Sequence, residues 1–348
     1  MKTVILLLTI LTFGFSANAR SLIDRIDKGI NDRTDILAVY EGGQLVYEEY
    51  RNGYQPKQKH KLWSMSKSLM GLMLGKTVAD KRMQLTDSIC DHVSVSELSS
   101  TSQCNITVED ILFWQSGTAW DETYLGIDGS KSNVLNGLYG EGIKDFSKYY
   151  FSLPYLPKIP NGWNYSTGDT HILGYLLKKV YSPMEYEAMP WTLLFDPLGI
   201  EDATFERDYE GTYLGGSYIY LSHGDLNKVA QYVLEELKQP KTLPKDWLPN
   251  ALTAKSTSLF NLDMIKDGVA PGVPGGHWWL NKPTNKIIQA VPWPSAPEDT
   301  FAAFGVFGQM MFIIPSMDLV IIRYAQDIRG GFDKDRMLEI IFDHLEEN

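Results

Sequence analysis

The sequence predicts an α/β (α+β) fold in which an antiparallel sheet is flanked by helices and carries an inserted, mostly helical lobe. Strand-like runs occur near both ends of the 348-residue chain, whereas the middle, from about Val78 to about Leu259, is mostly helical. The chain closes with an amphipathic helix from Asp333 to Leu345, whose apolar residues share one face. Strands at both ends with helices between them imply that the N- and C-terminal segments share one sheet.

Residues 1–19 have the features of a cleavable secretory signal. A basic start, Met1-Lys2, precedes an apolar run from Val4 to Phe15, and the A-x-A site ends at Ala19. The apolar run is shorter than the roughly 20 residues that a spanning helix needs, and no second run approaches that length. The sequence therefore predicts an exported protein, periplasmic or secreted, without stable membrane insertion and with one mature domain at residues 20–348.

A short helix and a β-hairpin are expected next. Ser21 caps an amphipathic helix that extends to Ile30. Two strand-like runs, Ile36–Tyr40 and Gln44–Tyr50, flank a Gly-Gly pair. Such a pair between apolar runs predicts a hairpin.

The stretch that starts at Trp63 predicts a buried helix with a hydroxyl and an amine on one face. Ser64 and Lys67 are three residues apart, a spacing that makes their side chains neighbours on an α-helix. Apolar residues cover nearly the whole circumference from Met65 onward, which indicates an internal helix. Burial favours the neutral form of an amine, which can take a proton from a serine. We interpret Ser64 and Lys67 as the centre of a nucleophilic active site.

In the middle of the chain, the pattern places a tyrosine on a loop. Pro154, Pro157 and Pro160 make a stiff, extended approach to Tyr165. Asp169 is positioned to cap the helix that follows. The sequence thus predicts that Tyr165 is held between a rigid entry and a helix start.

Strand-like runs return after a Gly/Pro-rich stretch at residues 268–276. The runs are His277–Leu280, Lys286–Val291, Phe301–Phe304, Met310–Ile314 and Leu319–Tyr324. A turn at residues 315–318 joins the last two. These runs supply the C-terminal half of the predicted sheet.

Composition excludes several classes of partner. The formal net charge is −11 and no cluster of Lys and Arg stands out, so nucleic acid binding has no electrostatic basis and a small-molecule or peptide-like substrate is expected. The six histidines show no metal-binding spacing, so neither a metal nor another cofactor is implied. Cys90 and Cys104 would close a short loop in an exported chain, which predicts a disulfide, with free buried thiols as the alternative.

Two further motifs follow Ser64-Met65-Ser66-Lys67 in order. They are Tyr165-Ser166-Thr167-Gly168-Asp169 and Gly305-Val306-Phe307-Gly308-Gln309. S-x-x-K is a signature of serine β-lactamases and penicillin-binding proteins, and the ordered triplet resembles that superfamily. The resemblance covers most of the mature chain. The residues of the three motifs are most similar to those of the 6-aminohexanoate-dimer hydrolases and esterases, a branch related to class C β-lactamases.

The resemblance implies a β-lactamase/transpeptidase-like fold and a serine hydrolase that forms an acyl-enzyme. Ser64 is then the nucleophile, and Lys67 and Tyr165 transfer its hydroxyl proton. Which of the two acts as the general base is left open. We expect Lys67 to lower the pKa of the Tyr165 phenol. The N–H groups of Ser64 and Val306 are expected to hold the oxyanion, because Gly305 allows the backbone to come close.

The third motif departs from the Lys-Thr-Gly of true β-lactamases. Ala303-Phe304-Gly305 keeps the Gly and lacks the Lys, so this strand offers no cation to a substrate carboxylate. Uncharged esters or amides are therefore the expected substrates. A β-lactamase or D-Ala-D-Ala carboxypeptidase is one alternative, and a non-catalytic sensor or scaffold that keeps the fold is another.

Two other motifs would indicate a different function. Gly71–Thr77 resembles a phosphate loop, but it has three residues between its glycines where four are needed. Asn164–Gly168 is an imperfect nucleophile elbow, in which Ser166 would be the nucleophile of an α/β-hydrolase.

Overall fold

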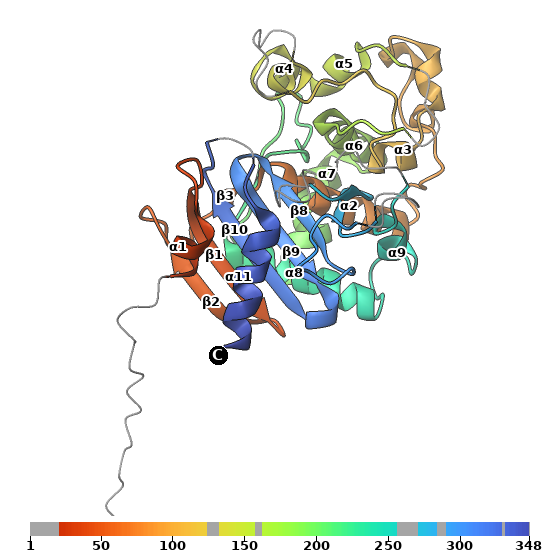
Figure 1. Ribbon diagram of the computed structural model, residues 1–348. Helices are drawn as coiled ribbons and strands as arrows, with labels where there is room; N and C mark the ends of the chain where they lie inside the picture. The colour runs from red at the N-terminus through yellow and green to blue at the C-terminus, as the bar shows by residue number, and fades with distance from the viewer. Residues whose placement is uncertain are drawn as a thin grey trace, which may run out of the picture.

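The structure is a computed structural model that describes residues 21–123, 132–156, 162–255, 271–283, 290–328 and 331–347 (Figure 1). The predicted signal at residues 1–19, Pro157, Pro160 and most of the strand-like run that starts at Lys286 lie outside these residues. Within the described ranges, every helix is too short or too polar to cross a lipid bilayer.

Seven of the described strands form one antiparallel sheet, in the order β2-β1-β10-β9-β8-β7-β6. Their bounds are Thr34–Glu41 (β1), Gln44–Tyr50 (β2), Val273–Pro274 (β6), Trp279–Leu280 (β7), Phe301–Gly305 (β8), Gln309–Ile314 (β9) and Leu319–Ala325 (β10). The N-terminal strand β1 pairs with the C-terminal strand β10, with Val39 opposite Ile321. The prediction that both ends of the chain share one sheet is therefore confirmed.

The hairpin of β1 and β2 forms where the Gly-Gly pair predicts it. Gly42 and Gly43 connect the two strands and have φ values of 56° and 77°. Glycine adopts this left-handed conformation without a steric penalty, which explains why the pair stands here.

The described helices lie between and around these strands. Their bounds are Leu22–Ile26 (α1), Ser66–Ala79 (α2), Val108–Leu112 (α3), Asn133–Tyr139 (α4), Phe146–Phe151 (α5), Thr167–Val180 (α6), Pro183–Pro190 (α7), His223–Lys238 (α8), Trp247–Ala251 (α9) and Lys334–Glu346 (α11). Figure 1 shows α3 to α6 gathered beyond one end of the sheet.

Helices cover both faces of the sheet. Along β1, Leu37 and Val39 point into a cluster with residues of α1 and α11, and Ile36 and Ala38 point into the larger cluster with α2 and α8. This alternation follows from the two-residue period of a strand, which sends successive side chains to opposite faces. Because both faces are buried, β1 reads as a continuous apolar run rather than an alternating one.

The segment between β1-β2 and β6 is mostly helical, as predicted. It also contains a small sheet that sequence analysis did not predict, in the order β3-β5-β4, with bounds His60–Lys61, Ile219–Leu221 and Thr204–Phe205. Within this segment, α8 packs on the face of the large sheet, whereas α4 and α5 stand away from it (Figure 1). The predicted bounds of the inserted lobe, roughly residues 78–259, stay a prediction.

Two predicted helix details are wrong. Helix α1 ends at Ile26, and Ile30, predicted on its buried face, is 96% exposed. Ser166, rather than Asp169, is the N-cap of α6, and its hydroxyl accepts the Asp169 N–H. The Asp169 carboxylate cannot cap the helix because it turns inward to other hydroxyls.

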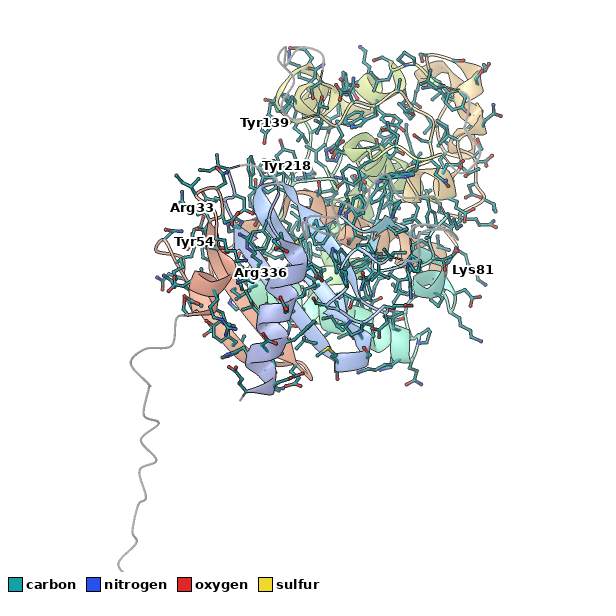
Figure 2. All side chains as sticks on the ribbon, viewed as in Figure 1. Arg33, Tyr54, Lys81, Tyr139, Tyr218 and Arg336 are labelled. Carbon is teal, nitrogen blue, oxygen red and sulfur yellow. A yellow bond between two sulfur atoms is a disulfide. The ribbon has the colours of Figure 1, made fainter. Side chains whose placement is uncertain are left out.

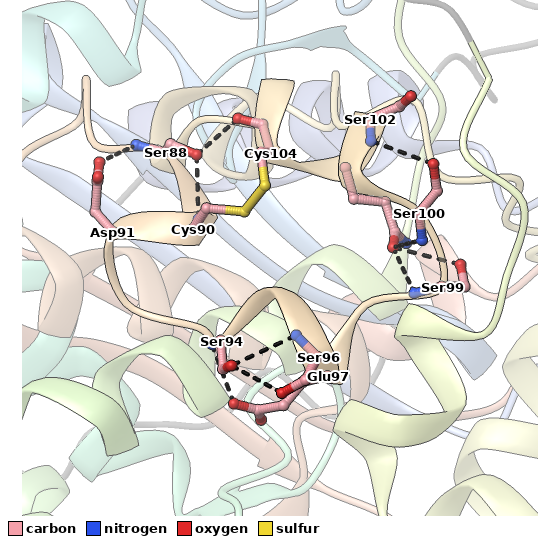
Figure 3. The surroundings of a disulfide bond; sticks show 11 residues. Ser88, Cys90, Asp91, Ser94, Ser96, Glu97, Ser99, Ser100, Ser102 and Cys104 are labelled. Carbon is pink, nitrogen blue, oxygen red and sulfur yellow. Dashed lines mark hydrogen bonds between the residues drawn. A yellow bond between two sulfur atoms is a disulfide. The ribbon is translucent and has the colours of Figure 1, made fainter.

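A disulfide joins Cys90 to Cys104, with Cα atoms 5.2 Å apart (Figure 3). The enclosed loop is built from short 3₁₀ helices that serine side chains cap. Ser88, Ser94 and Ser100 each begin one of these helices and accept a backbone N–H from it. The cross-link therefore closes a loop whose local turns are already defined by capping.

Candidate active site

Ser64 lies in a 3₁₀ turn, Trp63–Met65, that leads directly into α2. Lys67 is the second residue of α2, and its Nζ lies 2.9 Å from Ser64 Oγ. The predicted juxtaposition of hydroxyl and amine is therefore present. Helix α2 is buried almost all round, as its apolar pattern predicted, and only 1% of Lys67 is exposed.

Each of the three N–H groups of the Lys67 ammonium has a hydrogen-bond acceptor. Besides Ser64 Oγ, it donates to Thr167 Oγ1 at 2.8 Å and to the carbonyl oxygen of Gly216 at 2.9 Å. Burial lowers the pKa of Lys67 to about 8. The nearby Glu122 carboxylate has the opposite and smaller effect, because its negative charge raises that pKa. A lysine so perturbed changes its protonation state close to neutral pH, as an acid–base group must.

Tyr165 lies on the loop before α6, with its ring 5.0 Å from Lys67 Nζ. The expectation that Lys67 lowers the pKa of this phenol is wrong. Burial raises the pKa of Tyr165 well above its usual value and the Glu122 charge raises it further, while a hydrogen bond with Ser64 lowers it only in part. Lys67 Nζ lies over the ring face, and its charge does not overcome the effect of burial on the phenol pKa. Tyr165 therefore keeps its proton near neutral pH.

Two groups that sequence analysis did not select complete this cluster. Thr167 accepts the hydrogen bond from Lys67 and donates its own hydroxyl proton to Glu122 Oε1. Glu122 Oε2 accepts the Thr167 backbone N–H at 2.8 Å and the indole N–H of Trp120. A signal for Thr167 existed in the Tyr165 motif, but no local pattern marks Glu122, which lies 45 residues away in sequence.

The end of strand β8 faces the Ser64 turn. Ser64, Gly305 and Val306 line the same cleft. A Cβ atom at Gly305 would lie only 2.4 Å from the carbonyl oxygen of Leu62, so no other residue fits this contact without displacing the backbone. Ser64 and Val306 thus both line the cleft, and the role of their N–H groups as oxyanion donors stays a prediction.

The cleft has a volume of about 1030 Å³ and is lined mainly by aromatic and aliphatic side chains. Its charged lining residues are Glu122, Asp327 and Lys334. Asp327 pairs with buried Arg323 through two contacts of 2.8 Å. Lys334, at the start of α11, brings a cation to the cleft that sequence analysis did not foresee. Its Nζ lies 5.6 Å from the ring of Phe304 on β8.

Aromatic side chains hold the loops of the site. Trp114 contacts the Tyr165 ring at a centroid distance of 4.8 Å, and Trp279 lies 5.5 Å from the same ring. Lys61 contacts the nucleophile turn, with Nζ 4.0 Å from the Trp63 ring and 3.7 Å from the Tyr218 ring. Figure 2 shows Tyr218 between the helical lobe and the large sheet. The nucleophile turn and the tyrosine loop are therefore both packed against rings.

The rival nucleophiles are placed elsewhere. Ser66 is fully buried, and its hydroxyl accepts the backbone N–H of Ile219. Ser166 is 2% exposed and serves as the N-cap of α6. Neither lines the cleft. The stretch Gly71–Thr77 lies inside helix α2, which rules out a phosphate loop.

Two buried histidines lie near Lys67 without contacting its amine. His171 Nδ1 accepts the backbone N–H of Gly216, and His277 Nε2 lies 3.2 Å from Thr170 Oγ1. Burial and the Lys67 charge lower the pKa of His277 to about 3 and that of His171 well below its usual value. Among the described residues, no group of His, Cys, Asp and Glu side chains could hold a metal ion.

Comparisons with known proteins identify the family and the fold. The Beta-lactamase family model matches residues 22–346. A 6-aminohexanoate-dimer hydrolase from Paenarthrobacter ureafaciens is 22% identical over 304 residues, covering 84% of this chain and 72% of that protein. A Bacillus anthracis structure named as a candidate 6-aminohexanoate-dimer hydrolase has a TM-score of 0.68 and 18% identity, covering 94% and 81% of the two chains. A class C β-lactamase from Rhodobacter sphaeroides has a TM-score of 0.61 and 13% identity, covering 93% and 97%.

Proposed function

The chain belongs to the Beta-lactamase family, and from that premise we propose that it is an exported serine hydrolase that cleaves an amide or ester through an acyl-enzyme on Ser64. Family membership makes it a hydrolase of the serine β-lactamase type with a β-lactamase/transpeptidase-like fold. The observation that carries the serine mechanism is the 2.9 Å contact between Lys67 Nζ and Ser64 Oγ beside the cleft.

In this proposal Lys67 is the base of acylation. Its neutral amine takes the Ser64 proton while Ser64 Oγ bonds the carbonyl carbon of the substrate. The N–H groups of Ser64 and Val306 then hold the negative oxygen. Burial brings the pKa of Lys67 to about 8 and moves that of Tyr165 away from neutrality, so the amine is the better base of the two.

Tyr165 is assigned the complementary role. Its phenol keeps a proton near neutral pH and contacts Ser64, so it can pass a proton to the leaving group as the bond to that group breaks. Water then attacks the acyl-enzyme and releases the acid. In this proposal Lys67 is the base and Tyr165 the acid.

The cleft supports an uncharged acyl group as the substrate. Ala303 and Phe304 stand on β8 where a Lys and a Thr would stand in a true β-lactamase, and most of the residues that line the cleft are apolar. Because β8 itself gives no charge for a carboxylate, we expect a short-chain p-nitrophenyl ester to be hydrolysed and nitrocefin to be a poor substrate.

Lys334 favours a second candidate, hydrolysis of β-lactams or of D-Ala-D-Ala peptides, which both carry a carboxylate. Lys334 lines the cleft from α11 with its Nζ 5.6 Å from the Phe304 ring, and in this second candidate it supplies, from another element, the cation that β8 lacks. A charged hydrogen bond contributes about 1.5–3 kcal/mol, or roughly ten- to a hundredfold in rate. Lys334→Met should therefore lower the kcat/KM for nitrocefin far more than for a neutral ester if this candidate is correct.

Labelling with a fluorophosphonate tests the nucleophile. Wild-type protein should form one adduct on Ser64, and Ser64→Ala should form none, whereas Ser66→Ala and Ser166→Ala should still react. An adduct on Ser166 would instead support the nucleophile elbow of an α/β-hydrolase. If the folded wild-type protein formed no adduct, the alternative of a non-catalytic sensor or scaffold would be favoured. Nitrocefin as the far better substrate by kcat/KM would overturn the preference for neutral esters or amides.

Export is proposed from residues 1–19 alone, because the basic start, apolar run and A-x-A site are typical of a cleaved signal. Expression of the full chain in a bacterium should yield a mature protein that begins at Arg20 outside the cytoplasm. Intact-mass analysis of each cell fraction measures this. Unprocessed protein confined to the cytoplasm would contradict the proposal.

A further inference from the structure

The hydrogen bonds around Lys67 show that its amine must lose a proton before it can act as a base. All three N–H groups of the ammonium have an acceptor, in Ser64, Thr167 and Gly216. An ammonium has no lone pair, so in this state it cannot receive the Ser64 proton. The Gly216 acceptor is a backbone carbonyl, which does not take up a proton near neutral pH. The proton can leave only through the Thr167 hydroxyl or to solvent.

The Thr167 hydroxyl connects this amine to a carboxylate. Lys67 Nζ donates to Thr167 Oγ1 at 2.8 Å, and Thr167 donates in turn to Glu122 Oε1. On the basis of the proposed function, we propose that Thr167 and Glu122 form a proton relay that takes one proton from Lys67 before Ser64 attacks. In this relay Thr167 and Glu122 act through Lys67 and do not touch the substrate carbonyl.

The protons and electrons balance over one turnover. A proton moves from Lys67 Nζ to Thr167 Oγ1 as the Thr167 proton moves to Glu122, which leaves a neutral amine and a carboxylic acid. The Ser64 proton then passes to the amine, the Ser64 Oγ–carbon bond forms and the carbonyl electron pair moves to oxygen. Collapse of this adduct breaks the bond to the leaving group, which takes a proton from Tyr165, and Lys67 returns the Ser64 proton to the Tyr165 phenolate, so the amine is neutral again. Water then attacks the acyl-enzyme as its proton passes to Lys67, and collapse of the second adduct releases the acid while that proton passes from Lys67 to Ser64 Oγ. Glu122 finally returns its proton to the neutral Lys67 through Thr167.

Glu122 is fixed in a position suited to this role. The Thr167 backbone N–H and the Trp120 indole N–H both donate to its second oxygen, so Oε1 stays directed at the Thr167 hydroxyl. Its carboxylate also lines the cleft, where a proton can exchange with solvent.

The other titratable groups facing Lys67 do not provide this path. They are Tyr165, His171 and His277. Tyr165 retains its own proton, and neither imidazole hydrogen bonds the amine. The lowered pKa of His277 and of His171 makes both rings poor proton acceptors near neutral pH. Glu122 is thus the acceptor to which the hydrogen bonds of the described residues lead.

The experiment is the pH dependence of the acylation rate, measured as the p-nitrophenol burst in Glu122→Gln, Thr167→Val and the double variant. Lys67 has a pKa of about 8, so about one hundredth of it is neutral at about pH 6 without a relay. Wild-type acylation should change by less than about threefold between about pH 6 and pH 9.5. Both single variants should lose about ten- to a hundredfold at about pH 6 and recover to within about threefold at about pH 9.5.

Two features distinguish a relay from a structural or purely electrostatic role. The double variant should lose no more than either single variant, because the two residues act in series. Thr167→Ser restores a hydroxyl and should restore the flat profile. Removing the Glu122 charge alone would lower the Lys67 pKa and speed acylation at low pH, which is the opposite of the relay result. Glu141→Gln, on an exposed carboxylate that pairs with Lys144, is the matched control.

Acylation that is unchanged or faster at low pH in Glu122→Gln, or slower by one factor at every pH, overturns the relay. The proposed function is judged separately in the same assay. A burst in wild-type protein that disappears in Ser64→Ala supports the acyl-enzyme whatever the relay variants do. Absence of a burst and of a fluorophosphonate adduct in the wild type would instead reject the acyl-enzyme itself.

Discussion

Replacement of Gly305 by alanine adds only one methyl group, but it should strongly lower the catalytic rate. The added Cβ would lie 2.4 Å from the Leu62 carbonyl oxygen and 3.0 Å from the Cβ atoms of Trp63 and Gln309. A carbon and a carbonyl oxygen rarely approach closer than about 3.3 Å, so β8 and the Ser64 turn must separate by almost ~1 Å. The obstacle is backbone on an adjoining turn, and no side-chain rotation can relieve it.

A displacement of that size should lower mainly the rate of the chemical step, kcat. Misplacement of a reacting group by ~1 Å can cost about 10² in rate, and overpacking a tight contact costs about 1–3 kcal/mol of stability. We therefore expect Gly305→Ala to lower kcat for a p-nitrophenyl ester by about 10², with a smaller change in KM. Steady-state kinetics and urea unfolding measure the two effects.

Gly71 provides the matched control. It lies in the interior of α2, and an added Cβ would meet nothing closer than 3.6 Å. Gly71→Ala should therefore leave kcat within about threefold and stabilise the helix by about 0.5–1 kcal/mol. If Gly305→Ala kept wild-type kcat, or reacted with a fluorophosphonate at the wild-type rate, the claim that β8 must approach Ser64 this closely would be wrong.

Three further predictions follow from buried or cross-linked groups. Replacing Cys90 and Cys104 by serine should cost about 3 kcal/mol of unfolding free energy for a loop of this length, measured in urea, and an unfolding midpoint insensitive to reductant would contradict this. Burial raises the pKa of Asp169 to about 7, so the folded state holds a proton that the unfolded state releases above about pH 4. Stability should fall by about 1.4 kcal/mol per unit between about pH 4 and pH 7, and Asp169→Asn should remove that slope from the urea-unfolding profile. Tyr165→Phe should lower kcat by about 10² on an alkyl amide and much less on a p-nitrophenyl ester, whose phenolate leaves unprotonated, so an equal loss on both would exclude the acid role.

Much of the fold was predictable because its signals are local. The hairpin before Ser64 depends on two adjacent glycines, and the C-terminal strands and α11 follow from short apolar periods. The three-stranded sheet β3-β5-β4 was missed because its strands are two or three residues long, too short for a period to appear. The α6 cap was assigned to Asp169 instead of Ser166 because both residue types cap helices, and only the fold decides which side chain faces inward.

The candidate site was predictable only where its residues are close in sequence. The three-residue spacing of Ser64 and Lys67 is a property of one helical turn, and Tyr165 came from a motif. Glu122 and Lys334 reach the cleft through tertiary structure, from segments with no pattern that separates them from ordinary surface charges. The direction of the Tyr165 pKa was mispredicted for the same reason, because burial and the Glu122 charge outweigh the nearby amine.

The backbone around the proposed oxyanion groups shows why sequence cannot supply the remaining geometry. Trp63, just before Ser64, has φ of 50°, and Phe307, just after Val306, has φ of 64°. Bulky residues avoid this left-handed region, which costs of order 1–3 kcal/mol for each, so neither would be predicted there. The two rings contact each other edge to face at 5.4 Å, and Lys61 lies over the Trp63 ring. An aromatic pair contributes about 0.5–1.5 kcal/mol beyond its buried area, so this contact offsets part of the strain. The same contact joins the two turns that carry the proposed oxyanion N–H groups, and it therefore fixes their separation before a substrate arrives.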